Sequence, residues 1–278
     1  MKRLKFRLTL LGSALLMLAF TSVASAQATR TWVSGVGDDA NPCSRTAPCK
    51  TFGGAISKTA PGGEIDCLDP GGFGTVTITK SLIIDCDSGT GGILSSGTNA
   101  ININANASTD FVILRNLTIN GAGVSLGPNG IVVNTAKLVG LEDVVMNNFT
   151  TNCVTVTSSG TVNLYADDSK FINCGSGAGI AAGANAKATV TRSLIATPGI
   201  GISNTAAGSQ VFITGSSIGG AGTAFQSAAG AFIGVSGCTL ANNGTVYNQN
   251  GGQIFTGNDN PGFGNGPTGP TTGAVGKI

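Results

Sequence analysis

The feature that most constrains this chain is a short pattern that recurs seven times. In each copy two apolar residues flank one other residue, a polar or glycine pair follows, and a further apolar residue comes soon after. The copies begin at Val76, Val112, Val139, Leu164, Ala188, Val211 and Ile233, and their spacing falls from 36 to 22 residues. Apolar residues at i and i+2 of a strand point to the same side. Each copy therefore predicts a short strand with one buried face.

The rest of each repeat contains further apolar clusters, such as Ile101 with Ile103 and Ile200 with Ile202. Three short strands in each repeat are typical of one coil of a parallel β-helix, and such coils must stack to bury their apolar sides. The crossover preference makes the helix right-handed. An antiparallel sandwich is the main alternative, but it predicts hairpin turns of about two to five residues rather than one pattern kept in fixed columns. We predict an all-β, single-stranded, right-handed parallel β-helix.

The two ends of the chain differ from this repeat. Residues 1–26 combine a basic start, an apolar run and small residues before position 27, which are the three parts of a secretory signal peptide. We expect a secreted or periplasmic product, and the apolar run is too short to span a membrane. The β-helix is expected over residues 27–257, with an N-terminal cap over 27–66 that includes a short helix at 50–59. Residues 258–278 are rich in Gly, Pro, Thr and Asn, which predicts an irregular tail.

Composition excludes several classes of function. Without the predicted signal peptide, the chain has 11 basic and 13 acidic residues and a net charge of −2. A near-neutral surface argues against nucleic acid, whose partners usually carry a basic face. The chain contains no His, which removes Ser-His-Asp triads and most catalytic zinc sites. We expect a monomer without a nucleic-acid partner.

All seven cysteines follow the predicted signal peptide, and export favours disulfides. The short loop between Cys43 and Cys49 makes these two residues the best pair, and Cys67 with Cys86 is the second. Cys153 and Cys174 fall where neighbouring coils would meet, which leaves Cys238 over. The sequence does not decide the pairing among these last three.

Two segments near the N-terminus resemble a known family. Residues 31–42 (TWVSGVGDDANP) are similar to the opening of many secreted right-handed β-helix proteins, and residues 49–56 (CKTFGGAI) resemble their cap helix. Residues 62–65 (GGEI) stand where that family has a related turn. The resemblance is to the pectate-lyase-like β-helix superfamily, which includes lyases, hydrolases, epimerases and adhesins. The absence of His argues against a polygalacturonase-type hydrolase and against epimerases that use His.

Aligning the copies places polar residues in outward columns. One column contains Thr79, Arg115, Glu142 and Asp167, and the next contains Lys80, Asn116, Asp143, Asp168 and Arg192. Glu142, Asp143, Asp167 and Asp168 would form a four-carboxylate cluster, because adjacent coils lie about 4.8 Å apart. Such a cluster needs a compensating charge, and Ca2+ is the cation that suits oxygen ligands outside the cell.

The resemblance implies a role for such a cluster, because lyases of the superfamily bind Ca2+ on this sheet and use a nearby Arg or Lys as base. Here Arg192 or Lys170 would be the base. Tyr165 and Phe212, with Arg115, would contact the sugar. The simpler interpretation is a solvated face with the ion pairs Arg115–Glu142 and Asp168–Arg192, each of small energy. Asn148, Asn173 and Asn242 recur after the bends and predict an asparagine ladder.

Two functions follow from these observations. The first is a non-enzymatic surface, adhesive or glycan-binding module, which the short repeats favour because lyases usually build a deep groove from long insertions. The second is a Ca2+-dependent polysaccharide lyase acting on an acidic glycan, which the carboxylate cluster favours. We expect the first, with a polysaccharide or a cell-surface glycan as the partner.

Overall fold

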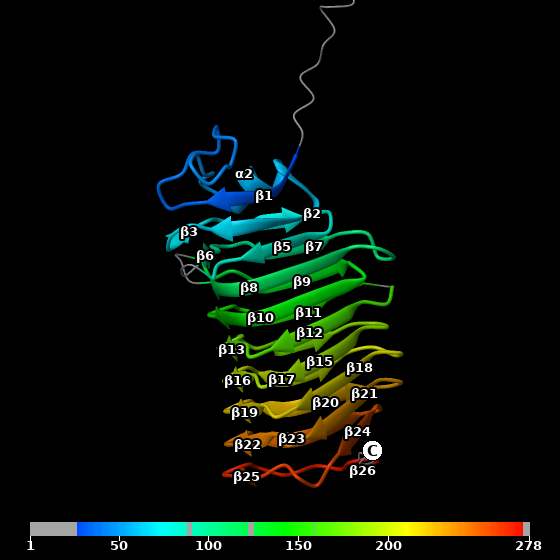
Figure 1. The fold of residues 1–278 in the computed structure, drawn as a ribbon. Helices are drawn as coiled ribbons and strands as arrows, with labels where there is room; N and C mark the ends of the chain where they lie inside the picture. Colours follow the sequence, from blue (N-terminus) through cyan, green and yellow to red (C-terminus); the bar gives the residue numbers. More distant parts are fainter. Residues whose placement is uncertain (1–26, 88–90, 122–124, 159, 275–278) are drawn as a thin grey trace, which may run out of the picture.

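The protein is a parallel β-solenoid. The computed structural model describes residues 27–87, 91–121, 125–158 and 160–274. Successive coils stack along one axis, with β1 at one end and β25 at the other (Figure 1). Leu114, Leu141 and Ala166 lie side by side in successive coils, and Val190 follows in the next coil. This parallel register confirms the stacked coils and excludes the sandwich.

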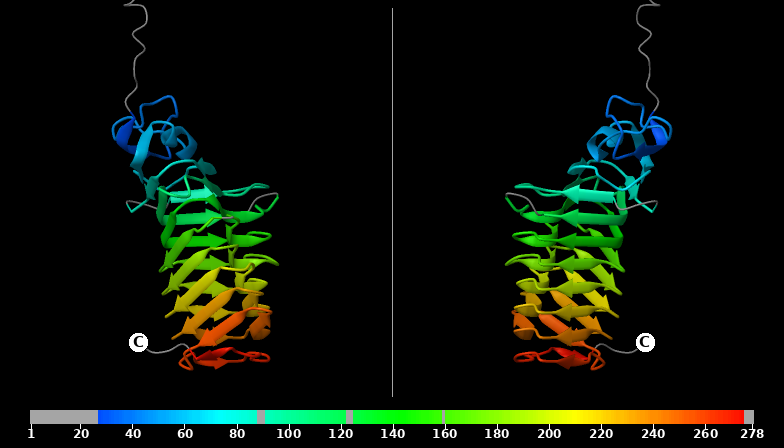
Figure 2. Two further views of the ribbon diagram at one scale, coloured as in Figure 1. Left: turned by 90° about the vertical axis from the view of Figure 1, so that its right-hand side faces the viewer. Right: turned by 90° about the vertical axis from the view of Figure 1, so that its left-hand side faces the viewer.

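Each coil contributes strands to three columns, two of which belong to an 18-stranded sheet and one to an eight-stranded sheet (Figures 1 and 2). The first column contains β1 (Ala28–Val33), β2 (Thr59–Cys67), β5 (Leu82–Asp85), β8 (Phe111–Asn120), β10 (Leu138–Asn147), β12 (Asn163–Asp167), β15 (Lys187–Thr191), β18 (Gln210–Thr214), β21 (Phe232–Ser236), β24 (Gln253–Thr256) and β26 (Gly273–Ala274).

The second column follows the first bend of each coil. It contains β3 (Gly71–Gly72), β6 (Gly91–Leu94), the second halves of β8 and β10, β13 (Lys170–Ile172), β16 (Leu194–Ala196), β19 (Ser217–Gly219), β22 (Thr239–Ala241) and β25 (Gly262–Phe263). The eight-stranded sheet contains β4 (Val76–Ile78), β7 (Ile101–Asn104), β9 (Asn129–Thr135), β11 (Asn152–Val156), β14 (Ala178–Ala182), β17 (Ile200–Asn204), β20 (Thr223–Ala228) and β23 (Thr245–Asn250).

The first bend explains the polar pair in the repeat. In β8, Val112 and Leu114 are buried before the bend, and Leu117 and Ile119 are buried after it. The residue at the bend has a left-handed backbone in successive coils: Asn116, Asp143, Asp168, Arg192, Gly215 and Gly237, with φ between 46° and 60°. Asn, Asp and Gly tolerate this conformation best. Backbone geometry therefore accounts for most of the residue types in this column.

The second bend contains part of the predicted asparagine ladder, because Thr197 and Gly220 stand between Asn173 and Asn242. Asn148, Asn173 and Asn242 all have left-handed backbones. The Asn173 amide donates to Asn148 Oδ1 at 2.9 Å, and the Asn148 amide donates to Asn120 at 3.3 Å. These bonds join neighbouring coils where the strands are interrupted.

The two ends of the rod differ from the predictions in detail. Helix α2 (Phe52–Ile56) is shorter than expected, because Thr51 caps its start and Thr59 already begins β2. The Phe52 ring packs on Phe73 at the N-terminal end, with centroids 5.2 Å apart. At the other end, β25 and β26 pair with β22 and β24. The described part of the tail is therefore paired to the rod through these two short strands, and its other residues lie outside strands.

Candidate functional site

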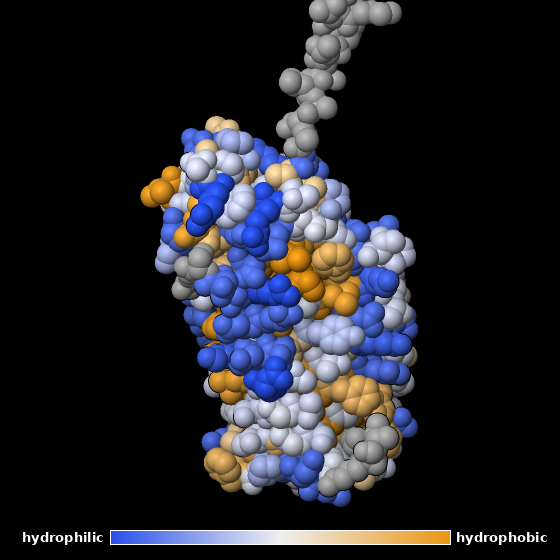
Figure 3. Space-filling view, viewed as in Figure 1, coloured by the Kyte–Doolittle hydropathy of each residue, from blue (hydrophilic) through white to orange (hydrophobic). Residues whose placement is uncertain are grey.

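The outward face of the first strand column carries the polar and aromatic side chains that the sequence singled out. Here a hydrophilic band runs beside apolar and weakly polar surface along the rod (Figure 3). Most of the charged residues lie on the coils nearer the N-terminus, from β1 to β12, together with Trp32 on β1. A second group of aromatic residues lies from β12 to β24.

The register of the first coil corrects the predicted columns. Asp85, not Thr79, lies beside Arg115, because Leu82–Asp85 pairs with Val112–Arg115. The copy that begins at Val76 belongs to the eight-stranded sheet, where it pairs with Ile101–Ile103. Apolar residues at i and i+2 occur on every strand of a coil, so this pattern alone does not tell which strand column a segment belongs to. The acidic residues of the first coils were therefore not predicted as part of the site.

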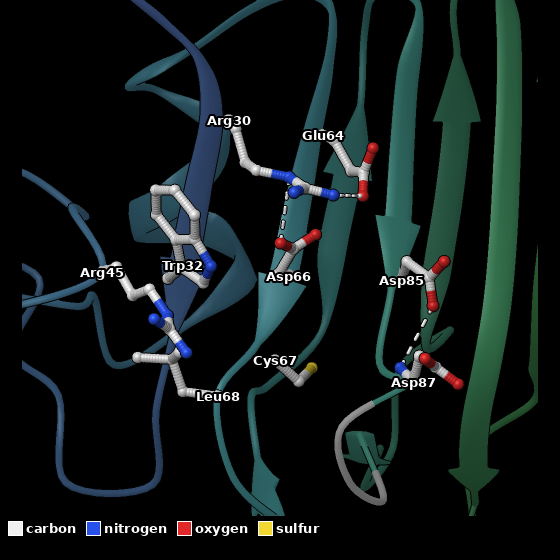
Figure 4. A pocket seen from close by; sticks show the side chains of 9 residues that line it. All are labelled: Arg30, Trp32, Arg45, Glu64, Asp66, Cys67, Leu68, Asp85 and Asp87. Carbon is white, nitrogen blue, oxygen red and sulfur yellow. Dashed lines mark hydrogen bonds and ion pairs between the residues drawn. The ribbon is translucent and has the colours of Figure 1, made fainter.

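These residues line a pocket of about 520 Å³ near the N-terminal end (Figure 4). Trp32 on β1, Asp66 on β2 and Asp85 on β5 are register partners on three successive strands. Glu64, two residues before Asp66, lies beside Arg30. We call this the N-terminal pocket, and its polar and aromatic lining includes Arg30, Trp32, Arg45, Glu64, Asp66 and Asp85.

Arg30 joins two of the pocket carboxylates. Its guanidinium donates to Glu64 Oε1 at 2.6 Å, and its Nε lies 3.1 Å from Asp66 Oδ2. The other oxygen of Asp66, Oδ1, is buried and has no hydrogen-bond partner in the structure. Burial first, and then a hydrogen bond from the protonated carboxyl group to Glu64, raise the pKa of Asp66 to about 7. The Arg30 guanidinium lowers the pKa of Glu64, so the two carboxyl groups differ in protonation near neutral pH.

The next charged residues form ion pairs between coils. Arg115 donates to Glu142 at 2.6 Å, as predicted, and its guanidinium lies 3.9 Å from Asp85. Arg192 binds Asp167 rather than the predicted Asp168. Asp168 occupies the left-handed bend and Asp167 ends β12, so only Asp167 shares the outward strand face with its neighbours.

The four predicted metal ligands do not act together. Glu142 and Asp167 are held by separate arginines, and Asp143 and Asp168 are exposed bend residues. Within the described ranges, no group of three or more His, Cys, Asp or Glu side chains is placed to hold a metal ion. The predicted four-carboxylate Ca2+ cluster is therefore not assembled.

The two predicted bases lie in different places. Arg192 is engaged with Asp167, so its charge is already compensated. Lys170 is exposed on β13, which follows the bend and pairs with β16 instead of lying on the face of β12. The structure thus does not bring Lys170 to the surface that carries Tyr165 and Phe212.

Aromatic side chains occupy every second coil of one outward column. Tyr165 on β12, Phe212 on β18 and Phe255 on β24 are separated by Thr189 and Gly234 in the same register. Tyr165 is 49% exposed and Phe212 is 44% exposed. Because adjacent coils lie about 4.8 Å apart, successive aromatic residues of the column are about 10 Å apart along the rod.

Phe232 joins the last two of these rings into a continuous surface. Its centroid lies 5.2 Å from that of Phe212 and 5.0 Å from that of Phe255. The Phe212 ring lies over Gly234, where an added Cβ would come within 2.7 Å of the ring. Glycine at this position therefore allows the ring to lie on the sheet. We call Tyr165, Phe212, Phe232 and Phe255 the aromatic ladder.

The disulfides agree with the cysteine analysis. Cys43 bonds to Cys49 and Cys67 bonds to Cys86, as predicted. Cys153 bonds to Cys174 between neighbouring coils. Cys238 is a buried free thiol, and burial raises its pKa, which is typical of an unreactive structural cysteine.

A comparison with solved structures supports the fold. No family model matches the sequence, and no curated protein matches it. Among solved structures, the chain is similar to pectate lyase Pel9A, with a TM-score of 0.57 and 16% identity over 92% of this chain and 82% of that one. It is also similar to the GH136 lacto-N-biosidase from Eubacterium ramulus, with a TM-score of 0.49 and 9% identity over 88% and 66% of the two chains.

At these identities the likeness concerns architecture alone. The described residues contain no helix of the length and apolar character needed to cross a bilayer. The predicted signal peptide, at 1–26, lies outside the described residues. The chain thus has a parallel β-helix fold similar to that of pectate lyase Pel9A, and its described residues form three disulfides.

Proposed function

We propose that this protein is a secreted, non-enzymatic β-helix that binds a glycan along the aromatic ladder. The observation that carries the proposal is the regular placement of aromatic rings on every second coil, with Tyr165 and Phe212 exposed and Phe255 half-buried. An extended polysaccharide also has a regular repeat and presents apolar C–H faces to flat aromatic surfaces. A rigid solenoid can hold several such rings in line with one extended ligand, which lowers the entropy cost of binding.

The surroundings of the ladder support a sugar rather than a protein partner. Thr189 separates Tyr165 from Phe212, and Gln210 and Gln253 flank Phe232 in the neighbouring column. Hydroxyl and amide groups beside aromatic faces suit a ligand rich in hydroxyls, because each sugar ring needs hydrogen bonds at its edge and an apolar contact on its face.

Two observations favour binding over catalysis. Arg192 is bound to Asp167, and Arg115 is bound to Glu142, so both arginines already have charge partners. A lyase would need a base free to remove a proton and a cation site to stabilise the resulting charge. The related fold of pectate lyase Pel9A is compatible with a carbohydrate ligand.

The disulfides support export. Three disulfides in a chain of this size fit an oxidising compartment, because cytosolic thiols are kept reduced. The signal-peptide pattern at residues 1–26 points the same way.

The experiment is affinity electrophoresis of the mature protein against a panel of neutral and acidic polysaccharides, with Phe212→Ala as the test variant. Leu194→Ala is the matched control, since Leu194 is a similarly exposed apolar residue on β16, beyond the bend. Truncating an anchor ring should weaken binding by at least about tenfold, or about 1.4 kcal/mol. Leu194→Ala should bind like the wild type. Equal affinity of Phe212→Ala and wild type for every glycan would refute the proposal.

Calcium provides the second arm of this experiment. A Ca2+-dependent lyase would release unsaturated products, detected by their ultraviolet absorbance, from an acidic polymer in the presence of millimolar Ca2+. We expect no such product and the same glycan affinity with Ca2+ or with a chelator. Formation of unsaturated products would show that the protein is a lyase and would refute the proposal of a non-enzymatic function.

A further inference from the structure

We propose that the N-terminal pocket binds an ammonium group carried on a small ring, as in an unacetylated amino sugar. The choice of a sugar as the carrier rests on the proposed glycan-binding function. The pocket itself is separate from the aromatic ladder, because it lies on β1, β2 and β5 and the ladder begins on β12. Its cavity of about 520 Å³ is within the size range of small-ligand sites.

The first argument is the arrangement of charge around the cavity. Asp66 and Asp85 are direct register neighbours on adjacent strands, where like charges are unfavourable. Arg30 forms ion pairs with Glu64 and Asp66. Arg115 lies closer to Glu142 than to Asp85, so it compensates the charge of Asp85 only weakly. The lining also contains the basic residue Arg45 and the acidic residue Asp87. With Asp66 ionised, four carboxylates face two guanidinium groups in the lining, and this excess of negative charge is what a bound cation would offset.

The second argument is the unpaired oxygen of Asp66. Oδ1 is buried without a hydrogen-bond partner, although buried polar atoms in proteins are nearly always paired. A ligand N–H donor in the pocket would supply the missing bond. An ammonium group has three such donors, so it can bond to Asp66 and Asp85 together.

The third argument is the tryptophan beside these carboxylates. Trp32 is a register partner of Asp66, and its half-buried ring forms one wall of the pocket (Figure 4). An indole face attracts cations and stacks on apolar ring faces. A metal ion would not use this wall, and the pocket carboxylates form no three-ligand group within the described residues. The carboxylates would also repel an acidic sugar, which leaves an organic cation as the matching class.

Protonation of Asp66 couples this binding to pH. Arg30 on β1, Glu64 on the same strand and Asp85 on β5 act on the Asp66 carboxyl. Arg45 and Asp87 are the other charged groups that line the pocket. With the pKa of Asp66 near 7, a proton occupies the carboxyl below neutral pH and competes with a cation. For a ligand of fixed charge, the affinity should rise by up to about tenfold between pH 6 and pH 8, following the ionised fraction of Asp66.

The test uses fluorescence of the full mature chain, because Trp32 is its single tryptophan. Glucosamine dimer should change the emission with a measurable Kd, and N-acetylglucosamine dimer, which lacks the charge, should bind at least about tenfold more weakly. Methylammonium, which keeps both its charge and its N–H donors between pH 6 and pH 8, tests the predicted pH dependence. The variant Asp66→Asn should lose the pH dependence and most of the affinity, and Asp85→Asn serves as a second variant in case the first fails to fold.

The outcomes separate this proposal from the proposed function. Phe212→Ala should leave the glucosamine response unchanged, because Phe212 is remote from the pocket. If the two dimers bind equally, or if methylammonium binds with the same affinity at pH 6 and pH 8, the ammonium site is refuted, and the proposal for the aromatic ladder is unaffected. If Phe212→Ala loses no glycan affinity but the two dimers differ in affinity, the ammonium site is supported and glycan binding along the aromatic ladder is refuted.

Discussion

The left-handed bend makes a quantitative prediction at Gly215. This glycine has φ of 56°, and an added Cβ would meet no atom within 4 Å. Gly215→Ala therefore changes backbone conformational energy without a steric clash. For an L-residue the left-handed conformation costs about 1–2 kcal/mol, so the variant should lose that amount of stability. In a protein of this size the melting temperature should fall by about 2–8 °C.

Gly72→Ala is the matched control for Gly215→Ala. Gly72 also has no atom within 4 Å of an added Cβ, but its backbone does not have a positive φ. Alanine there should be neutral or stabilise by about 0.4–1 kcal/mol through the unfolded chain. Urea unfolding followed by circular dichroism measures both variants, compared at equal m-values. Equal midpoints for the two variants would refute the left-handed bend at Gly215.

Three further predictions concern charge, the bend and the disulfide. The pKa of Asp66 is raised from 3.8 in an ordinary carboxyl to about 7. Between these two pH values the carboxyl group keeps its proton in the folded state and has lost it in the unfolded state. Stability should therefore fall as pH rises from about 4 to 7. A difference of one pKa unit corresponds to about 1.4 kcal/mol, so the free energy of unfolding should fall by at most about 4 kcal/mol. Solvent screening reduces this loss to about 1–2 kcal/mol. Asp66→Asn should abolish this decline in urea unfolding, and an unchanged pH slope would contradict the raised pKa. Arg192→Gly removes an exposed ion pair of about 0–1 kcal/mol but relieves a left-handed non-glycine residue, so its melting temperature should stay level or rise; a clear drop would show that the ion pair dominates. Replacing Cys153 and Cys174 together by Ala should cost about 2–4 kcal/mol, and an unchanged denaturation midpoint would show that their bond contributes nothing.

The stacked fold could be predicted because its signal repeats. The same apolar spacing returns in every coil, so Leu114, Leu141 and Ala166 were aligned correctly from the sequence and lie side by side in the structure. The same alignment placed Tyr165 and Phe212 in one outward column and paired Arg115 with Glu142. Periodicity is reliable here because one slipped position would move a whole strand's apolar residues to the surface.

The errors arise where the repeat is irregular. The first coil was aligned on Val76, which belongs to another sheet, so the N-terminal pocket was missed. A useful signal was present, because Asp66 and Asp85 each precede one member of the predicted pair Cys67–Cys86. Two cysteines that bond across coils place their preceding residues side by side on the outer face. The partner of Arg192 was also wrong, since the backbone conformation at Asp168 is not encoded in apolar spacing.

Binding of a glycan along the aromatic ladder can be tested by measuring affinity as a function of oligosaccharide length, using fragments of the glycan that binds best. If the ligand lies along the ladder, affinity should step up when the fragment first spans Phe212 and Phe255, about 10 Å apart, and again when it reaches Tyr165. Phe212→Ala should abolish the first step. An affinity that is independent of length beyond a single sugar, with no effect of Phe212→Ala, would contradict the account.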